Sequence, residues 1–316
     1  MVRSIQMLLA FTTLVGVLLT ACGAPAQTTQ PTAAPQPAPA EAAPVRIGSK
    51  NFTEAILVAE MYALALENAG IRVERKFNLG ATPVAHTALV NGEIDLYPEY
   101  TSTGLLEVLK QAPISDARAI LEAVRKGYEE QFKLTWLEPS PFNNTNALAM
   151  TRQRAEELGI RTYSDLVARS GELKLGGPPE FPEREDTKGL MAAYGFDPKF
   201  IGDNFVQLDT GALRYEALMK GDIDVVVAFG TDGQINGLGL ALLEDDKNYY
   251  PIYQIAPVIR QDTLTANPII AETLNKLAPL LTNDVMSGLN WQVDGPEKKE
   301  IADVARTFLQ QQGFIK

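Results

Sequence analysis

Short apolar runs alternate along this chain with longer stretches in which apolar residues recur every three or four positions. The run 45–47 predicts a strand, and the apolar positions of segment 56–65 have the spacing of one helix face. Thr53 precedes that segment and is predicted to cap the helix. Near the carboxyl terminus, residues 264–316 predict three helices and a tail. Alternating strands and helices predict an α/β protein.

The pattern is duplicated within the chain. Segment 92–104 begins Gly-Glu-Ile-Asp and segment 221–233 begins Gly-Asp-Ile-Asp, and each predicted strand ends on an aromatic residue, Tyr100 in the first and Phe229 in the second. Because ligands of open α/β sheets bind at the carboxyl ends of strands, two such halves would place these rings on opposite walls of one cleft. The alternative is that Gly-acid-Ile-Asp is a common helix-to-strand turn and that the match arises by chance.

The amino terminus has the features of an export signal. Arg3 is followed by an uncharged run over 4–21, which ends in Leu-Thr-Ala directly before Cys22, the single cysteine of the sequence. This pattern predicts a signal peptide over 1–21. The residues around Cys22 resemble the bacterial lipobox, in which the signal is cut before the cysteine and the thiol receives diacylglycerol. The alternative is an uncleaved transmembrane anchor. Both place the remaining chain outside the cytoplasmic membrane.

Composition separates a tether from a folded body. Residues 22–44 are rich in Pro and Ala and carry one charge, Glu41, so they predict an extended tether. The chain of 316 residues is long enough for two domains, and its 46% hydrophobic content is a globular value. The net charge of −11 argues against nucleic acid and against anionic lipid surfaces as partners.

Residues that carry catalysis are scarce in this sequence. His86 is the single histidine and lies inside a predicted amphipathic helix, where we expect a structural or surface role. No Gly-x-Ser-x-Gly elbow, Walker loop, His-Glu-x-x-His or dinucleotide fingerprint occurs. Glu99 and Asp232 are weak candidates for an acid pair across the cleft, because carboxylates are common near strand ends. The sequence therefore predicts no enzyme, no metal site and no cofactor.

Five motifs resemble the substrate-binding proteins of osmoprotectant ABC importers, the glycine betaine, carnitine and choline binders of the OpuC/ProX type. They occur in the family's order, and the resemblance covers the chain from about residue 45 to the carboxyl terminus. The motifs are GSKNFTE at 48–54, YPEYTSTG at 97–104, FNNT at 142–145, FGTDG at 229–233 and APVIR at 256–260.

The resemblance implies a type II periplasmic-binding-protein fold, in which two α/β lobes are joined by a hinge and hold the ligand between them. Lobe one is expected to contain residues 45–146 and 256–316, and lobe two residues 147–255. The implied partners are a small quaternary-ammonium ligand and the permease and ATPase subunits of the importer, with a lipid anchor in the cell membrane. A monomer is the default for this architecture.

The resemblance also implies the ligand site. A trimethylammonium group donates no hydrogen bond, so aromatic faces must bind it, each worth about 0.5 to 2 kcal/mol. The carboxylate of a betaine is expected to meet cations and a hydroxyl. The family's cage positions fall on Tyr100, Asn146, Phe229 and Tyr253, and its carboxylate positions on Lys50, Thr103 and Arg184.

Several of these positions leave alternatives open. Phe229 lacks the hydroxyl of the family's tyrosine, and Asn146 departs from the aromatic pattern, which would cost about 1 to 2 kcal/mol of binding if nothing fills the space. Thr103 favours a zwitterion with a carboxylate over choline. The alternative for Lys50 is a solvated surface lysine, which is the usual environment of this residue type. The alternative for Arg184 is a surface arginine in an ion pair, which is likewise the usual case. The expected cargo is a zwitterion of the glycine betaine class; the alternatives are carnitine, choline or ergothioneine, or a sensory module without a transporter.

Overall fold

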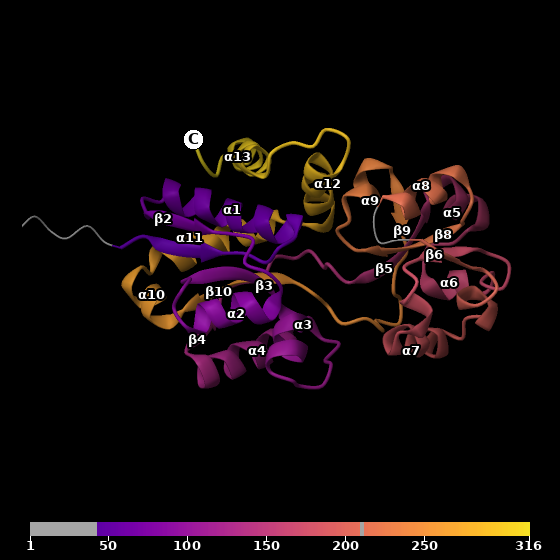
Figure 1. Cartoon of the computed structure of the whole chain (residues 1–316), viewed down its shortest axis with the longest axis horizontal. Helices are drawn as coiled ribbons and strands as arrows, with labels where there is room; N and C mark the ends of the chain where they lie inside the picture. The colour runs from indigo at the N-terminus through magenta and orange to yellow at the C-terminus, as the bar shows by residue number, and fades with distance from the viewer. Residues whose placement is uncertain (1–42, 209–211) are drawn as a thin grey trace, which may run out of the picture. The chain divides into compact units, whose positions relative to one another are not determined.

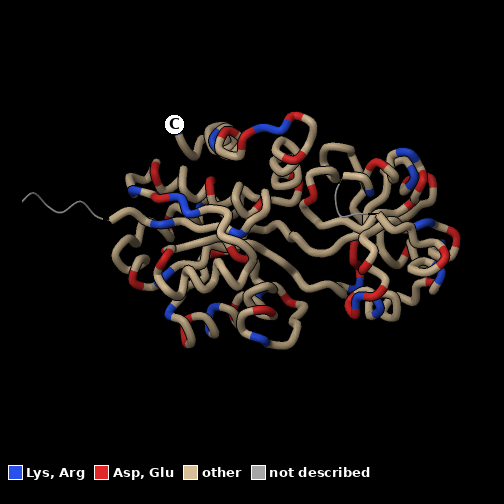
Figure 2. Tube along the Cα trace, viewed as in Figure 1, with Lys and Arg blue, Asp and Glu red and all other residues tan. Residues whose placement is uncertain are grey.

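The computed structural model describes residues 43–208 and 212–316 (Figure 1). The predicted signal peptide, Cys22 and the predicted tether up to residue 42 lie outside the described residues. Among the helices of the described part, none is long and apolar enough to cross a membrane. Basic and acidic residues are interspersed along the described chain (Figure 2).

The first of two five-stranded sheets, sheet A, is mixed. Its strand β1 runs parallel to β2 and β3, whereas β10 runs antiparallel to β3 and β4. In spatial order the strands are β2 (Val73–Lys76), β1 (Val45–Gly48), β3 (Leu96–Tyr100), β10 (Ile255–Arg260) and β4 (Leu134–Trp136).

The second sheet, sheet B, repeats this arrangement. β6 runs parallel to β7 and β8, and β5 runs antiparallel to β8 and β9. The two sheets share one strand order, as the internal repeat predicts, and Tyr100 and Phe229 are the last residues of the equivalent strands β3 and β8. In spatial order the strands are β7 (Phe205–Gln207), β6 (Leu175–Gly177), β8 (Val225–Phe229), β5 (Asn146–Thr151) and β9 (Leu240–Leu242).

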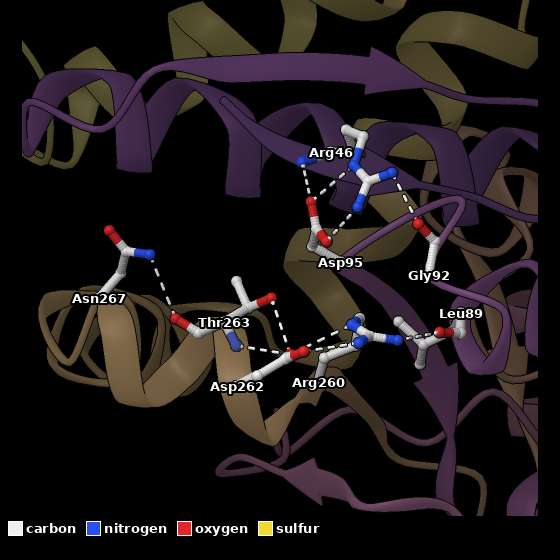
Figure 3. Close-up of polar contacts among 8 residues, drawn as sticks. All are labelled: Arg46, Leu89, Gly92, Asp95, Arg260, Asp262, Thr263 and Asn267. Carbon is white, nitrogen blue, oxygen red and sulfur yellow. Dashed lines mark hydrogen bonds and ion pairs between the residues drawn. The ribbon is translucent and has the colours of Figure 1, made fainter. Parts of the chain in front are cut away.

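The aspartate that ends the repeated motif has the same role in each sheet. In sheet A the Asp95 carboxylate accepts hydrogen bonds from the backbone N–H of Arg46 at 2.8 Å and from its guanidinium, Nε at 2.9 Å and Nη2 at 2.7 Å (Figure 3). In sheet B the Asp224 carboxylate accepts from the backbone N–H of Lys174 at 3.0 Å and from Arg154 Nε at 3.1 Å. Each aspartate thus joins the starts of two neighbouring strands, β3 and β1 in sheet A and β8 and β6 in sheet B.

Helices cover both faces of each sheet. On sheet A, α1 packs with α11 and α13 on one face, and α2 and α4 lie on the other (Figure 1). On sheet B, α5, α6 and α7 cover one face and α8 and α9 the other. The helices around sheet A are α1 (Thr53–Asn68), α2 (Thr82–Val90), α3 (Thr101–Thr103), the π-helix η1 (Gly104–Val108), α4 (Ala117–Phe132), α10 (Gln261–Ala266), α11 (Ile269–Leu277), the 3₁₀-helix η4 (Ala278–Leu280), α12 (Asn283–Asp294) and α13 (Ile301–Gln311). Those around sheet B are α5 (Arg152–Leu158), α6 (Tyr163–Val167), the 3₁₀-helices η2 (Phe181–Glu183) and η3 (Pro198–Ile201), α7 (Glu185–Tyr194), α8 (Leu213–Lys220) and α9 (Gly233–Gly237).

Helix α1 begins at Thr53, so the prediction that Thr53 caps this helix is wrong. Phe52 holds the N-cap position, because its backbone is extended and its carbonyl accepts the first helical hydrogen bond, from Ile56 at 3.1 Å. The Thr53 hydroxyl donates instead to Asp294 Oδ1 in α12, at 2.8 Å. The start of α1 is therefore joined to the end of α12.

Two segments that connect the sheets run side by side. The backbone N–H of Tyr253 donates to Asn143 Oδ1 at 2.7 Å, and its carbonyl accepts from the backbone N–H of Asn144 at 3.1 Å. Asn283, at the start of α12, donates from Nδ2 to the carbonyls of Asn143 and Gly230, at 3.2 and 3.1 Å. The two connections and α12 therefore meet at one place between the sheets.

The strands of sheet A lie within 45–136 and 255–260, and those of sheet B within 146–242. The lobe bounds expected from the sequence, 45–146 with 256–316 and 147–255, remain a prediction. We use "lobe one" for sheet A with its helices and "lobe two" for sheet B with its helices.

Helix α9 of lobe two packs against α12 of lobe one at very close range. A Cβ atom on Gly237 would lie 2.1 Å from the ring of Trp291, and one on Gly233 would lie 2.7 Å from the backbone nitrogen of Trp291. Glycine at these two positions is therefore what lets the helices approach.

Candidate functional site

A cavity of about 430 Å³ lies where the two lobes meet. The start of α1 and the end of β3 form its wall on lobe one, and the residues that follow β8 form its wall on lobe two. The connections contribute Asn144 and Tyr253, and α12 contributes Asn290 and Asp294. The site is thus at the carboxyl ends of equivalent strands, where ligands bind in α/β sheets.

Five of the seven predicted ligand residues line this cavity: Lys50, Tyr100, Thr103, Phe229 and Tyr253. Asn146 and Arg184 are not among its lining residues. Asn146 lines a separate hollow and pairs with Phe229 in sheet B. Arg184 precedes α7 and forms an ion pair with Asp186, Nη2 to Oδ2, at 2.5 Å. The ligand roles of all seven residues remain predictions.

The aromatic residues of the cavity differ in how much ring they offer. Phe229 and Phe52 are each 39% exposed, and Tyr253 is half-buried. The Tyr100 ring is buried, with Phe52 stacked at a centroid distance of 6.1 Å and Lys50 Nζ 4.6 Å from its centroid. In this conformation of the protein, the rings of Phe52, Phe229 and Tyr253 are therefore more accessible to a ligand than the ring of Tyr100.

Lys50 is a buried, paired cation rather than a solvated lysine. Its Nζ donates to Glu99 Oε1 at 2.5 Å, and both side chains are almost fully buried. The Tyr97 hydroxyl donates to the other carboxylate oxygen of Glu99 at 3.0 Å. The positive charge of Lys50 is therefore already balanced inside lobe one.

The candidate acid pair of Glu99 and Asp232 is not formed, because each carboxylate has its own cation. Asp232 Oδ2 accepts from Arg214 Nη2 at 2.9 Å and from the Tyr215 hydroxyl. His86 lies apart from the cavity and packs edge-on against Tyr128 and Phe132, where burial lowers its pKa. This is the structural environment that we expected for His86.

Glu54 is a cavity residue that the sequence analysis missed. It is 4% exposed, and its carboxylate accepts from the Tyr100 hydroxyl at 2.6 Å and from the amides of Asn144 and Asn290, both at 2.9 Å. Burial raises the pKa of Glu54, and hydrogen bonds from Thr231 and these three groups partly offset this. In the described residues no ion pair is formed with Glu54. Glu54 therefore lines the cavity without an ion-pair partner among the described residues.

Two sheets of one strand order, joined by two connections and with a polar and aromatic cavity between them, define a type II periplasmic-binding protein. The model of the family "Substrate binding domain of ABC-type glycine betaine transport system", OpuAC, matches residues 43–311. The chain belongs to this family. The resemblance that the five motifs predicted is confirmed.

Individual relatives agree with this assignment. The chain is 35% identical over 276 residues to the ergothioneine transport permease/ergothioneine binding protein EgtU of Helicobacter pylori (strain G27), covering 87% of this chain and 48% of that protein. It thus spans about half the length of that relative. It is 34% identical over 275 residues to the carnitine transport binding protein OpuCC of Listeria monocytogenes serotype 1/2a (strain 10403S), covering 86% of this chain and 87% of that protein.

A solved structure described as "Crystal structure of glycine betaine/carnitine/choline ABC transporter" has the same fold, with a TM-score of 0.81 and 31% identity over 86% of this chain and 100% of that one. The predicted type II fold is therefore confirmed. The chain is a substrate-binding protein of a betaine/carnitine/choline-type ABC importer, not an enzyme. Such proteins bind small molecules outside the cytoplasm and work with permease and ATPase subunits.

Most of the other lining residues were absent from the sequence-based site, among them Phe52, Glu54, Asn144 and Asn290. Two of them, Phe52 and Glu54, lie inside the first family motif, and an acid at the start of an apolar helix was the available signal. Asn144 lies in the third motif, two residues before Asn146. Asn290 is 236 residues from Glu54, and no local pattern links the two.

Proposed function

We propose that this protein binds a quaternary-ammonium zwitterion of the glycine betaine class between its lobes and delivers it to a permease. The observation that carries this proposal is the combination of exposed aromatic rings with uncompensated acid in one cavity. Phe52, Phe229 and Tyr253 supply ring faces for a group that cannot donate hydrogen bonds. Glu54 and Asp294 supply negative charge, since neither is in an ion pair within the described chain.

We assign the anionic end of the ligand to the part of the cavity that Lys50 and Thr103 line. The Lys50 ammonium has three N–H donors, of which Glu99 Oε1 and, at 3.4 Å, Thr82 Oγ1 accept two, so one is left for a carboxylate. Arg184 belongs to lobe two and lies outside the cavity here, so its predicted contact requires the lobes to close. We assign that closure to a hinge motion at the two connections.

The test is calorimetric titration of the purified protein with glycine betaine, carnitine, choline and ergothioneine. We expect a zwitterion to bind and Phe229→Ala to weaken that binding about tenfold or more, because one exposed ring face is lost. Leu242→Ala is the matched control: Leu242 is 37% exposed, close to the 39% of Phe229, but lies outside the cavity. Absence of heat with all four ligands, or equal affinity in both variants, contradicts the aromatic site.

The amino-terminal features complete the proposal. Cleavage before Cys22 and diacylation of its thiol would tether a monomeric receptor to the outer face of the cell membrane through residues 22–44. Mass spectrometry of the protein extracted from membranes tests this, with a mature amino terminus at Cys22 carrying a lipid mass as the expected result. An intact amino terminus at Met1 contradicts it.

A further inference from the structure

Helix α12 carries a stripe of polar side chains along one side. The stripe consists of Asn283, Ser287, Asn290 and Asp294. These residues are four, three and four positions apart, the spacing that aligns side chains on one side of a helix. On a second side of α12, Met286 and Leu289 are buried in the core of lobe one, and on a third, Trp291 packs against α9 of lobe two. The stripe therefore runs along the seam between the lobes.

Three side chains of the stripe donate to successive main-chain carbonyls of lobe two, in segment 230–232. The carbonyls of Gly230, Thr231 and Asp232 accept, in that order, from Asn283 Nδ2 at 3.1 Å, Asn290 Nδ2 at 2.9 Å and Ser287 Oγ at 2.8 Å. The segment directly follows β8, and the side chains of Thr231 and Asp232 line the ligand cavity. The stripe thus holds this wall by its main chain and does not use the side chains that line the cavity.

The two amides of the stripe also bind groups outside lobe two. Asn283 donates to the Asn143 carbonyl at 3.2 Å and accepts from the Asn143 backbone N–H at 3.1 Å, in one of the two connections. Asn290 donates to Glu54 Oε2 at the start of α1, at 2.9 Å. An amide NH₂ group has two N–H donors, and in each case one of them goes to lobe two and the other across the seam. Each amide therefore links the 230–232 segment to a group outside lobe two.

Ser287 holds the same segment through a buried hydroxyl. It is 3% exposed, donates to the Asp232 carbonyl and accepts from the backbone N–H of Asn236 in α9, at 3.1 Å. A hydroxyl can make both bonds at once, whereas alanine makes neither. Ser287 is not among the residues that line the cavity. Its substitution therefore changes the support of the wall without removing a ligand contact.

We infer that the polar stripe of α12 positions the lobe-two wall of the ligand cavity, with Ser287 as a positioning residue. The apolar side of α12 is anchored in lobe one, and the stripe holds the residues that follow β8 against it. Binding sites need supporting hydrogen bonds that hold their side chains within about 0.5 Å of the productive geometry. Loss of one such bond lets Phe229 and Asp232 shift relative to Glu54 on the lobe-one wall. The expected effect on ligand binding rests on the proposed function, and the expected effect on the distance between the lobes does not.

The first test compares Ser287→Ala with Ser170→Ala. Ser170 is the matched control, because this buried serine of lobe two also donates to a carbonyl, that of Val167 at 2.8 Å, and accepts from a backbone N–H, that of Asp197 at 3.0 Å. Both variants lose the same kinds of bond, so a general loss of stability affects them alike. In calorimetry with glycine betaine, carnitine, choline and ergothioneine, we expect Ser287→Ala to weaken binding about threefold to tenfold and Ser170→Ala to keep the wild-type affinity. Equal affinities in the two variants overturn the inference.

The second test needs no ligand. Spin labels are attached at Lys126→Cys in α4 and Glu156→Cys in α5, two exposed positions on different lobes, in the full chain with Cys22→Ser. Pulsed electron paramagnetic resonance then measures the distribution of distances between the lobes. We expect a broader distribution when Ser287→Ala is added and an unchanged one when Ser170→Ala is added.

The two tests separate the inference from the proposed function. An unchanged distance distribution in Ser287→Ala overturns the inference, whatever the protein binds. If none of the four solutes binds the unaltered protein, the proposed function fails, and the distance distribution alone decides whether the stripe of α12 positions the wall.

Discussion

Among single residues, Lys50 shows how a predicted ligand residue can also be part of the core. Its partner Glu99 is fully buried and also accepts from the Tyr100 backbone N–H at 2.7 Å. Removal of one member of a buried ion pair leaves the other charge uncompensated. A loss of ligand binding in a Lys50 variant would therefore not by itself identify Lys50 as a ligand residue.

We predict that Lys50→Met lowers the free energy of unfolding by about 3–5 kcal/mol. Addition of Glu99→Gln should restore part of this loss, because the unpaired charge is removed while the hydrogen bonds to Tyr97 and Tyr100 can persist. Urea unfolding followed by circular dichroism measures both. Lys276→Met, which breaks an exposed pair with Glu272, is the control and should cost less than about 1 kcal/mol. Losses of equal size at Lys50 and Lys276 would contradict the buried-pair interpretation.

Among secondary-structure elements, the repeated motif acts as a clamp between two neighbouring strands, β1 and β3 in sheet A and β6 and β8 in sheet B. The clamp of sheet A is the stronger, because Asp95 binds a backbone N–H and two guanidinium nitrogens and is almost buried, whereas Asp224 binds one of each and Arg154 is 41% exposed.

We predict that Asp95→Ala destabilises the protein by about 2 kcal/mol and Asp224→Ala by less, because a backbone donor and more guanidinium donors lose their acceptor in the first case. Chemical denaturation of the two variants in parallel provides the comparison. A larger loss for Asp224→Ala would mean that the additional bonds to Arg46 contribute little.

The clamp also explains what could be predicted from sequence. Gly92 and Gly221 both have positive φ, 71° and 77°, so the same local geometry demands the same residues in each half, and the repeat can be recognised without a structure. The alternation of strands and helices was predictable from the spacing of apolar residues. The Glu54 network was not, since Asn290 reaches Glu54 from α12 by tertiary packing alone. The sequence also could not show that Asn146 begins β5 and lines a separate hollow instead of the cavity.

For the whole molecule, the contact between α9 and α12 is the point at which the lobes are packed most tightly. Because Gly237 lies against the ring of Trp291, a side chain there must displace that ring.

We predict that Gly237→Ala weakens ligand binding about threefold to tenfold without touching the cavity, since overpacking shifts one lobe against the other. Gly288→Ala in α12, whose added Cβ would meet its nearest atom at 3.8 Å, is the matched control. Calorimetry on the two variants checks this, and equal affinities would show that the contact does not govern closure.

A dissociation constant combines two quantities: how tightly the closed form binds its ligand, and what fraction of the molecules is able to close. The α9–α12 contact bears on the second quantity alone. Apparent affinity is the intrinsic affinity of the closed form multiplied by the fraction of molecules able to close, so a tenfold change in that fraction changes the apparent constant tenfold. Substitutions along this contact therefore tune the concentration at which the receptor fills, while the cavity that selects the cargo stays the same. It follows that receptors with one chemical specificity can serve habitats with very different supplies of the same solute.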